Sequence, residues 1–128
     1  MKLLLDTHIV LAIIWRDLDD RYPHWAKMIQ GAPSQSFVSV VSLWEIAIKT
    51  RAEKLDPQIP LSAIEGYLEE LGFPILPISA AHVTKTIVPD IPTRDPFDRL
   101  LVAIAQTESM RLVTVDRALA DHPVTFRI

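Results

Sequence analysis

The chain has 128 residues, of which 49% are apolar and 23% charged, and its formal net charge is −3. This length predicts one domain over residues 1–128 with a self-sufficient core, and the absence of cysteine excludes disulfides, thiolate metal sites and cysteine nucleophiles. The longest apolar run, residues 9–15, is too short for a membrane span, so we expect a soluble, cytoplasmic protein. The net charge lacks the basic excess of a passive nucleic-acid binder.

Short apolar segments alternate with helical ones in the first half of the chain. In order, the pattern predicts a strand over residues 2–5, a nearly all-apolar helix from Thr7, a helix around Trp25 that Gly31 ends, a strand over residues 36–41 and a helix over residues 42–54. Acids and a proline within residues 17–23 indicate a solvated break between the first two helices.

The second half continues this alternation with more proline. The predicted elements are a helix over residues 63–71, a strand over 75–78, helices over 80–87 and 97–109, a strand over 112–115 and a last strand over 124–128. Ser62 and Glu65 have the spacing of a capping box, and Pro77 predicts that its weak strand lies at a sheet edge or forms a bend. Strands alternating with helices predict an α/β fold, a three-layer α/β/α sandwich around a mainly parallel sheet.

Four carboxylates from separate segments are expected at one rim of this sheet. Asp6 and Asp116 stand where apolar strands stop, and ligands of open parallel sheets bind beyond the carboxyl ends of the strands. Glu45 and Asp98 fall in the first turns of the helices predicted over residues 42–54 and 97–109. We therefore expect the four acids to point into one cleft.

Each acid also has an ordinary structural role open to it. Asp6 and Asp116 are suited to cap the helices that they precede. Glu45 is spaced to form a capping box with Ser42, or to pair with Lys49 one helical turn later. Taken singly, these acids do not define a site.

The segment around residue 98 has a similar alternative. Asp95 before Pro96 is typical of a helix N-cap, which makes Asp98 an acid that complements the helix dipole. However, buried charges cost free energy unless they are paired or bind metal, and nearby cations are too few to pair all four acids. These cations are Lys49, Arg94, Arg99 and Arg117.

A shared divalent cation explains the four acids together. Hard oxygen ligands suit Mg²⁺ or Mn²⁺, and one or two such ions support phosphodiester hydrolysis. Asp6 and Asp98 are the expected direct ligands, and Glu45 and Asp116 are expected to bind metal or position water. The hydroxyls of Thr7, Ser42 and Thr114 are candidates for orienting these groups. His8 is placed to reach the edge of the cleft, although a single histidine in an apolar helix is more often structural, and the other three histidines lack the spacing of a zinc site.

Four ordered blocks, residues 3–8, 42–46, 94–101 and 112–116, resemble the PIN-domain family, specifically VapC-type toxins of type II toxin–antitoxin modules. The resemblance implies a PIN-like fold, Mg²⁺- or Mn²⁺-dependent endoribonuclease activity, a homodimer and a cognate antitoxin. It implies that the acidic quartet is Asp6, Glu45, Asp98 and Asp116, with Asp95 in support. RNA contacts are expected from Lys49, Arg94, Arg99 and Arg117. Ile104 departs from the family, which often has Gln there.

Two other functions compete with this hypothesis. A receiver-like phospho-accepting signalling domain is also a small α/β protein with an acidic Mg²⁺ site, but it needs further acids after the first strand and a Lys at the end of a late strand. Here Thr7 and His8 follow Asp6, and Asp116 ends the late strand. The third interpretation is a non-catalytic partner-binding domain whose acids only cap helices.

Overall fold

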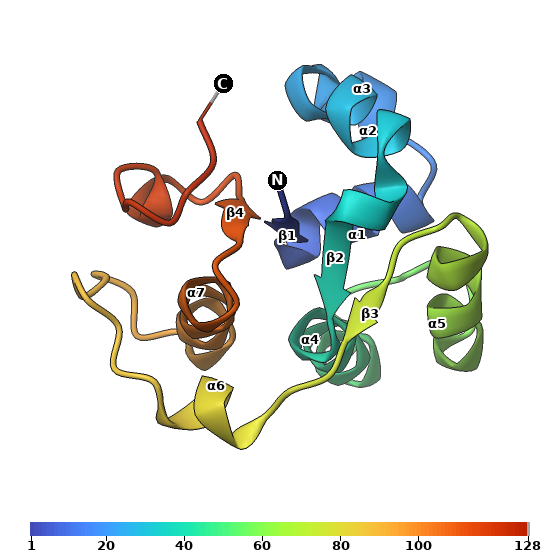
Figure 1. Ribbon diagram of the computed structural model, residues 1–128. Coiled ribbons are helices and arrows are strands. Elements are labelled where there is room, and N and C mark those ends of the chain that lie inside the picture. The colour runs from blue at the N-terminus through green and yellow to red at the C-terminus, as the bar shows by residue number, and fades with distance from the viewer. Residues whose placement is uncertain (128) are drawn as a thin grey trace.

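The computed structural model describes residues 1–127, and its centre is a four-stranded parallel sheet (Figure 1). The strands are β1 (Leu3–Leu5), β2 (Ser36–Ser39), β3 (Ile75–Leu76) and β4 (Arg111–Val113), in the order β3-β2-β1-β4. Leu4 of β1 pairs with Phe37 on one side and with Leu112 on the other. The two-residue strand β3, which Pro77 follows, lies at the edge as predicted.

Helices connect these strands. They are α1 (Thr7–Ile14), α2 (Leu18–Arg21), α3 (Pro23–Gly31), α4 (Val40–Arg51), α5 (Leu61–Glu70), α6 (Ala80–Thr84) and α7 (Pro96–Thr107), with 3-10 turns η1 (Pro33–Gln35) and η2 (Arg117–Leu119). The break predicted at residues 17–23 holds the short helix α2, and the helix predicted over 80–87 ends early, at Thr84.

Successive residues of β1 enter opposite cores, as the twofold period of a strand requires. Leu3 and Leu5 pack with α1, α3 and α5, whereas Leu4 packs with α7. Figure 1 shows α7 on the other side of the sheet from α2 and α3. Burial on both faces explains the continuous Leu3–Leu5 run, and it confirms the predicted three-layer α/β/α sandwich.

Two predicted helix starts are wrong. α4 begins at Val40 because strand pairing ends with Ser39, whose hydroxyl accepts the Val41 N–H at 3.0 Å and caps the helix. The capping box predicted at Ser42 therefore does not form, and Glu45 lies in the second turn rather than the first. Likewise, α5 starts at Leu61 after Pro60 and has no side-chain cap, so the box predicted at Ser62 is absent.

The strand predicted over residues 124–128 is also wrong. Thr125 makes one isolated parallel bridge to Leu112, and no strand forms within residues 124–127; Ile128 lies outside the described residues. The Thr125 hydroxyl donates to the Leu119 carbonyl at 2.6 Å, which ties the tail to η2. Local side-chain bonds of this kind compete with a strand ladder.

No helix within residues 1–127 is long and apolar enough to cross a membrane.

Candidate active site

Asp6 is fixed at the carboxyl end of β1 by backbone donors from two directions. Its Oδ1 accepts the Ile9 N–H at 3.0 Å and caps α1, while Oδ2 accepts the Val115 N–H at 3.0 Å from the segment after β4. The predicted capping role is therefore confirmed. Only 6% of Asp6 is exposed, and burial raises the pKa of its carboxyl, against the hydrogen bonds that it accepts. The carboxylate is buried and held in one orientation.

Glu45 reaches the same region from the second turn of α4. Its Oε1 accepts the Thr7 hydroxyl at 2.6 Å, and its Oε2 accepts Lys49 Nζ at 2.6 Å. Thr7 Oγ1 also lies 3.1 Å from Ser42 Oγ; because Thr7 gives its single proton to Glu45, Ser42 donates to Thr7. The predicted pair with Lys49 is confirmed, and the two hydroxyls form a buried chain that orients Glu45.

Asp95 and Asp98 separate into the two roles that the sequence indicates. Asp95 Oδ1 accepts the Phe97 N–H at 2.8 Å and the Asp98 N–H at 3.3 Å, so Asp95 caps α7 with Pro96 in its first turn. The half-buried Asp98 caps nothing. Burial raises the pKa of its carboxyl from 3.8 to about 7, and negative neighbours act in the same direction, in the order Asp95, Asp116 and Glu45.

Asp116 lies three residues beyond β4 rather than at its end. Its Oδ1 accepts the Ala118 N–H at 2.9 Å and caps η2, which confirms a capping role here too. The Asp116 N–H in turn donates to Thr114 Oγ1 at 3.0 Å. The Asp116 carboxylate is also one of the negative neighbours that raise the pKa of Asp98, so the segment after β4 and the start of α7 bring these two acids close together.

These acids line one pocket of about 470 Å³, called the acid pocket below. It contains the four predicted acids together with Thr7, Asp95, Lys49 and Arg117, and also His8 and Val115. The exposed His8 lies in this lining, at the cleft edge that its position two residues after Asp6 lets it reach. Ser42 and Thr114 are buried and do not line this pocket.

Two predicted contact residues lie elsewhere. Arg99 turns away from the acids: its Nη2 binds Asp90 at 2.8 Å and its Nη1 binds the Thr93 carbonyl at 3.0 Å. Because successive helical residues point about 100° apart, Arg99 cannot share the direction of Asp98. Arg94 lines a different pocket, described below.

The donor set of the acid pocket fits a divalent cation. Within residues 1–127, no three Asp, Glu or His side chains already surround a common point at ligand distance. Mg²⁺, however, keeps several waters and takes one or two protein carboxylates. Burial raises the pKa of Asp98, and the negative charges of Asp95, Asp116 and Glu45 add to the shift; a divalent cation would offset these charges.

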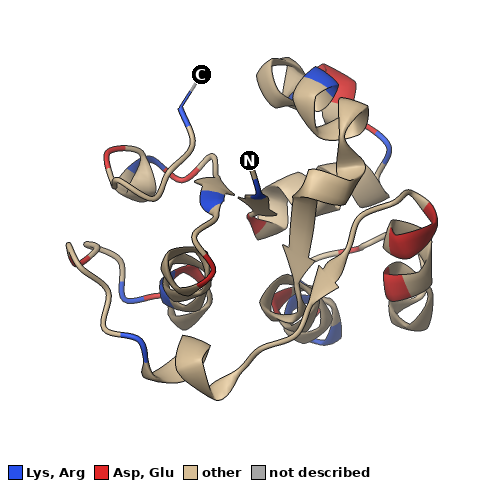
Figure 2. Ribbon diagram, viewed as in Figure 1, with Lys and Arg blue, Asp and Glu red and all other residues tan. Residues whose placement is uncertain are grey.

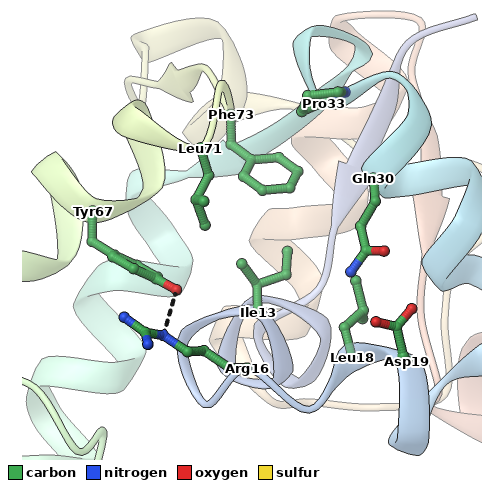
Figure 3. Close-up of a pocket in the computed structure, with 9 residues that line it drawn as sticks. All are labelled: Ile13, Arg16, Leu18, Asp19, Gln30, Pro33, Tyr67, Leu71 and Phe73. Atoms are coloured by element: carbon green, nitrogen blue, oxygen red, sulfur yellow. Dashed lines mark hydrogen bonds between the residues drawn. The ribbon is translucent and has the colours of Figure 1, made fainter.

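A second pocket of about 420 Å³ lies between α1, α3 and α5 and contains none of the predicted site residues (Figure 3). Ile13, Leu71 and Phe73 form its apolar lining, and Arg16 Nε donates to the Tyr67 hydroxyl at 3.2 Å across one side. This pocket lacks a cluster of carboxylates, so it is not the candidate active site.

The sheet order and the four acids beyond its carboxyl edge define the class of protein: an α/β sandwich with an acidic pocket at one edge of a parallel sheet. The PIN domain family model matches residues 3–124, and the chain belongs to that family. Over 130 residues, covering 95% of each chain, it is 32% identical to Ribonuclease VapC22 of Mycobacterium tuberculosis (strain ATCC 25618 / H37Rv). The resemblance drawn from the four sequence blocks is thereby confirmed.

Proposed function

We propose that this chain is a divalent-metal-dependent endoribonuclease and the toxin of a type II toxin–antitoxin module. The observation that carries the proposal is the acid pocket, where Asp98, its pKa raised to about 7, shares a lining with four further acids. Membership of the PIN domain family and the ribonuclease name of the relative support the same reaction.

The four acids are proposed to have two roles at the metal site. Asp6 and Asp98 are the proposed direct ligands of Mg²⁺ or Mn²⁺, and Glu45 and Asp116 complete the site as ligands or by positioning water. When bound, the ion supplies Lewis-acid stabilisation of the attacked phosphate and activation of water. Asp6 contributes a rigid oxygen pair, because two backbone N–H groups hold its carboxylate in place.

The remaining polar residues orient substrate and acids. Thr7 and Ser42 hold Glu45, Asp95 fixes the first turn of α7, and Thr114 holds the segment that bears Asp116. Lys49 and Arg117 line the acid pocket and supply the positive charge that a backbone phosphate needs there. Arg94 and Arg99 remain proposed contacts outside this pocket.

The competing functions fit the contacts less well. A receiver domain needs further acids after its first strand and a Lys at the end of a late strand. Here Thr7 and His8 follow Asp6, and the acid Asp116 follows the late strand β4. A partner-binding domain whose acids only cap helices explains Asp6, Asp95 and Asp116. It does not explain Glu45 or Asp98, which cap no helix.

RNA, a cognate antitoxin and a second copy of the chain are the proposed partners, and the cytoplasm is the proposed location. Trp44 and Ile48, one turn apart on α4, are 52% and 38% exposed, and such apolar surface is typical of protein interfaces. Trp15 is half-buried, and its Nε1 donates to the Asp56 carbonyl at 3.0 Å, so it adds little to this surface.

The test is cleavage of single-stranded and structured RNAs with Mg²⁺, Mn²⁺ or chelator, followed by mapping of the cut ends. Asp6→Asn and Asp98→Asn are expected to abolish ion-dependent cleavage while retaining the fold. Asp20→Asn is the matched control, since Asp20 is an exposed acid in the first turn of α2. Full activity in both site variants, or cleavage that persists in chelator, would refute the proposal.

A further inference from the structure

A second polar pocket lies on the other side of the α7 N-terminus and has the opposite charge. This basic pocket, of about 740 Å³, is formed by α6, the loop over residues 85–95 and the first turns of α7. Its lining includes three cations, Lys85, Arg94 and Arg99, and one acid, Asp90. Figure 2 shows the basic segments between α6 and the start of α7. The chain as a whole is negative, so this is a local excess.

Two of these cations have no ion-pair partner among residues 1–127. Arg99 is bound to Asp90 at 2.8 Å and to the Thr93 carbonyl at 3.0 Å, so its charge is balanced within the loop. Lys85 and Arg94 form no salt bridge in this part of the chain, and both are exposed. The pocket therefore offers two free positive charges to a ligand.

The loop that carries Arg94 is held in place by three side chains outside it. Besides Arg99, Gln106 Nε2 donates to the Val88 carbonyl at 2.8 Å, and His122 Nε2 donates to the Pro89 carbonyl at 2.7 Å. His122 Nδ1 accepts the Val124 N–H, which leaves Nε2 as the nitrogen that carries the proton. A loop fixed in this way binds a ligand without the full cost of ordering.

The basic pocket and the acid pocket share the start of α7. Arg94 and Pro96 line the basic pocket, whereas Asp95, which lies between them in the sequence, lines the acid pocket. A strand whose phosphate lies at the carboxylates can therefore cross this turn and bring a neighbouring phosphate to Lys85 and Arg94. The lining also includes apolar side chains, with Ile87 buried and Leu100 half-buried, against which a base can pack.

We propose that the basic pocket binds one nucleotide of the RNA substrate next to the cleaved bond, with its phosphate held by Lys85 and Arg94. This inference rests on the proposed ribonuclease function and adds a binding site outside the carboxylate cluster. Phosphate contacts position a strand without reading its sequence, so the pocket fixes the path of the RNA rather than its base specificity.

The experiment measures binding separately from cleavage. A fluorescent single-stranded RNA is titrated in chelator, by anisotropy and over a range of salt, with the full chain and with the double variant Lys85→Gln/Arg94→Gln. Each neutralised phosphate of a single strand contributes about −0.7 to the slope of log K against log salt, so losing the one phosphate held by both side chains makes the slope less steep by about 0.7. At 0.15 M salt the same relation gives a Kd increase of about fourfold.

The matched control is Lys27→Gln/Lys54→Gln, which removes the same number of exposed charges away from the pocket. It is expected to keep the Kd and the slope of the unmodified chain. The inference would be overturned if the two double variants showed the same Kd and slope. It would also be overturned if the unmodified chain bound no RNA. If the slope changes as expected but no RNA is cleaved with any ion, the basic pocket stands and the ribonuclease proposal fails.

Discussion

Replacing Asp98 by Asn is expected to stabilise the metal-free protein while abolishing its activity. Burial and the nearby charges of Asp95 and Asp116 oppose ionisation of Asp98, and its pKa rises to about 7 as a result. An Asn amide carries no charge and retains a donor for the Asp116 carboxylate, as protonated Asp98 does. Replacing a residue that serves function at a cost in stability is expected to raise stability and lower activity.

The size of the effect follows from the shift. About three pKa units correspond to about 4 kcal/mol as an upper bound. Asp98 is only half-buried, so solvent screening reduces this to about 1–2 kcal/mol. Its charge in the first turn of α7 also interacts favourably with the helix dipole, worth about 0.3–1 kcal/mol, which Asn loses. The net gain is about 1 kcal/mol, or about 4 °C in Tm for a domain of this size.

The sign of the pH dependence is fixed by the same shift. Between pH 3.8 and about 7 the native state holds a proton on Asp98 that the unfolded chain has released, so this contribution to stability is lost as pH rises through 7. Thermal unfolding in chelator should show the gain of Asp98→Asn at pH 8 and no gain near pH 4. A variant that lowers Tm equally at both pH values would refute the reasoning, and Asp20→Asn should change neither.

Three further predictions concern the ion, the hydroxyl chain and the core. Mg²⁺ at about one hundred times its Kd should stabilise the chain by about 2.7 kcal/mol, seen as a higher Tm, and an equal rise in Asp6→Asn would contradict its assignment as a ligand. Thr7→Val removes a hydrogen-bond partner of Glu45 and of the Ser42 hydroxyl, so the free energy of unfolding measured in urea should fall by about 1–3 kcal/mol. Thr7→Ser keeps the hydroxyl and should retain most of the stability. An equal fall in both variants would exclude the hydrogen bond as the cause. Leu4→Ala, at a fully buried position, should cost about 2–5 kcal/mol by the same assay, whereas a cost below 1 kcal/mol would contradict its place in the core.

Features set by neighbouring residues were predictable from the sequence. The cap at Asp95 before Pro96, the pairing of Glu45 with Lys49 and the edge position of the strand before Pro77 all follow from local spacing, and each is confirmed. The start of α4 was not predictable in this way. Ser39 and Ser42 are equally good caps locally, and the choice depends on where pairing with β3 stops.

Residues that bear charge were evident from the sequence, but their direction and environment were not. Four acids could be named because each lies close after a predicted strand or close to the start of a predicted helix, which is a local pattern. That they line one pocket, that Arg99 turns to Asp90 while His8 joins the lining, and that the pKa of Asp98 reaches about 7 were decided by the tertiary structure. Burial and Coulomb interactions act through space, between segments that the sequence keeps far apart, and so only the folded chain sets them.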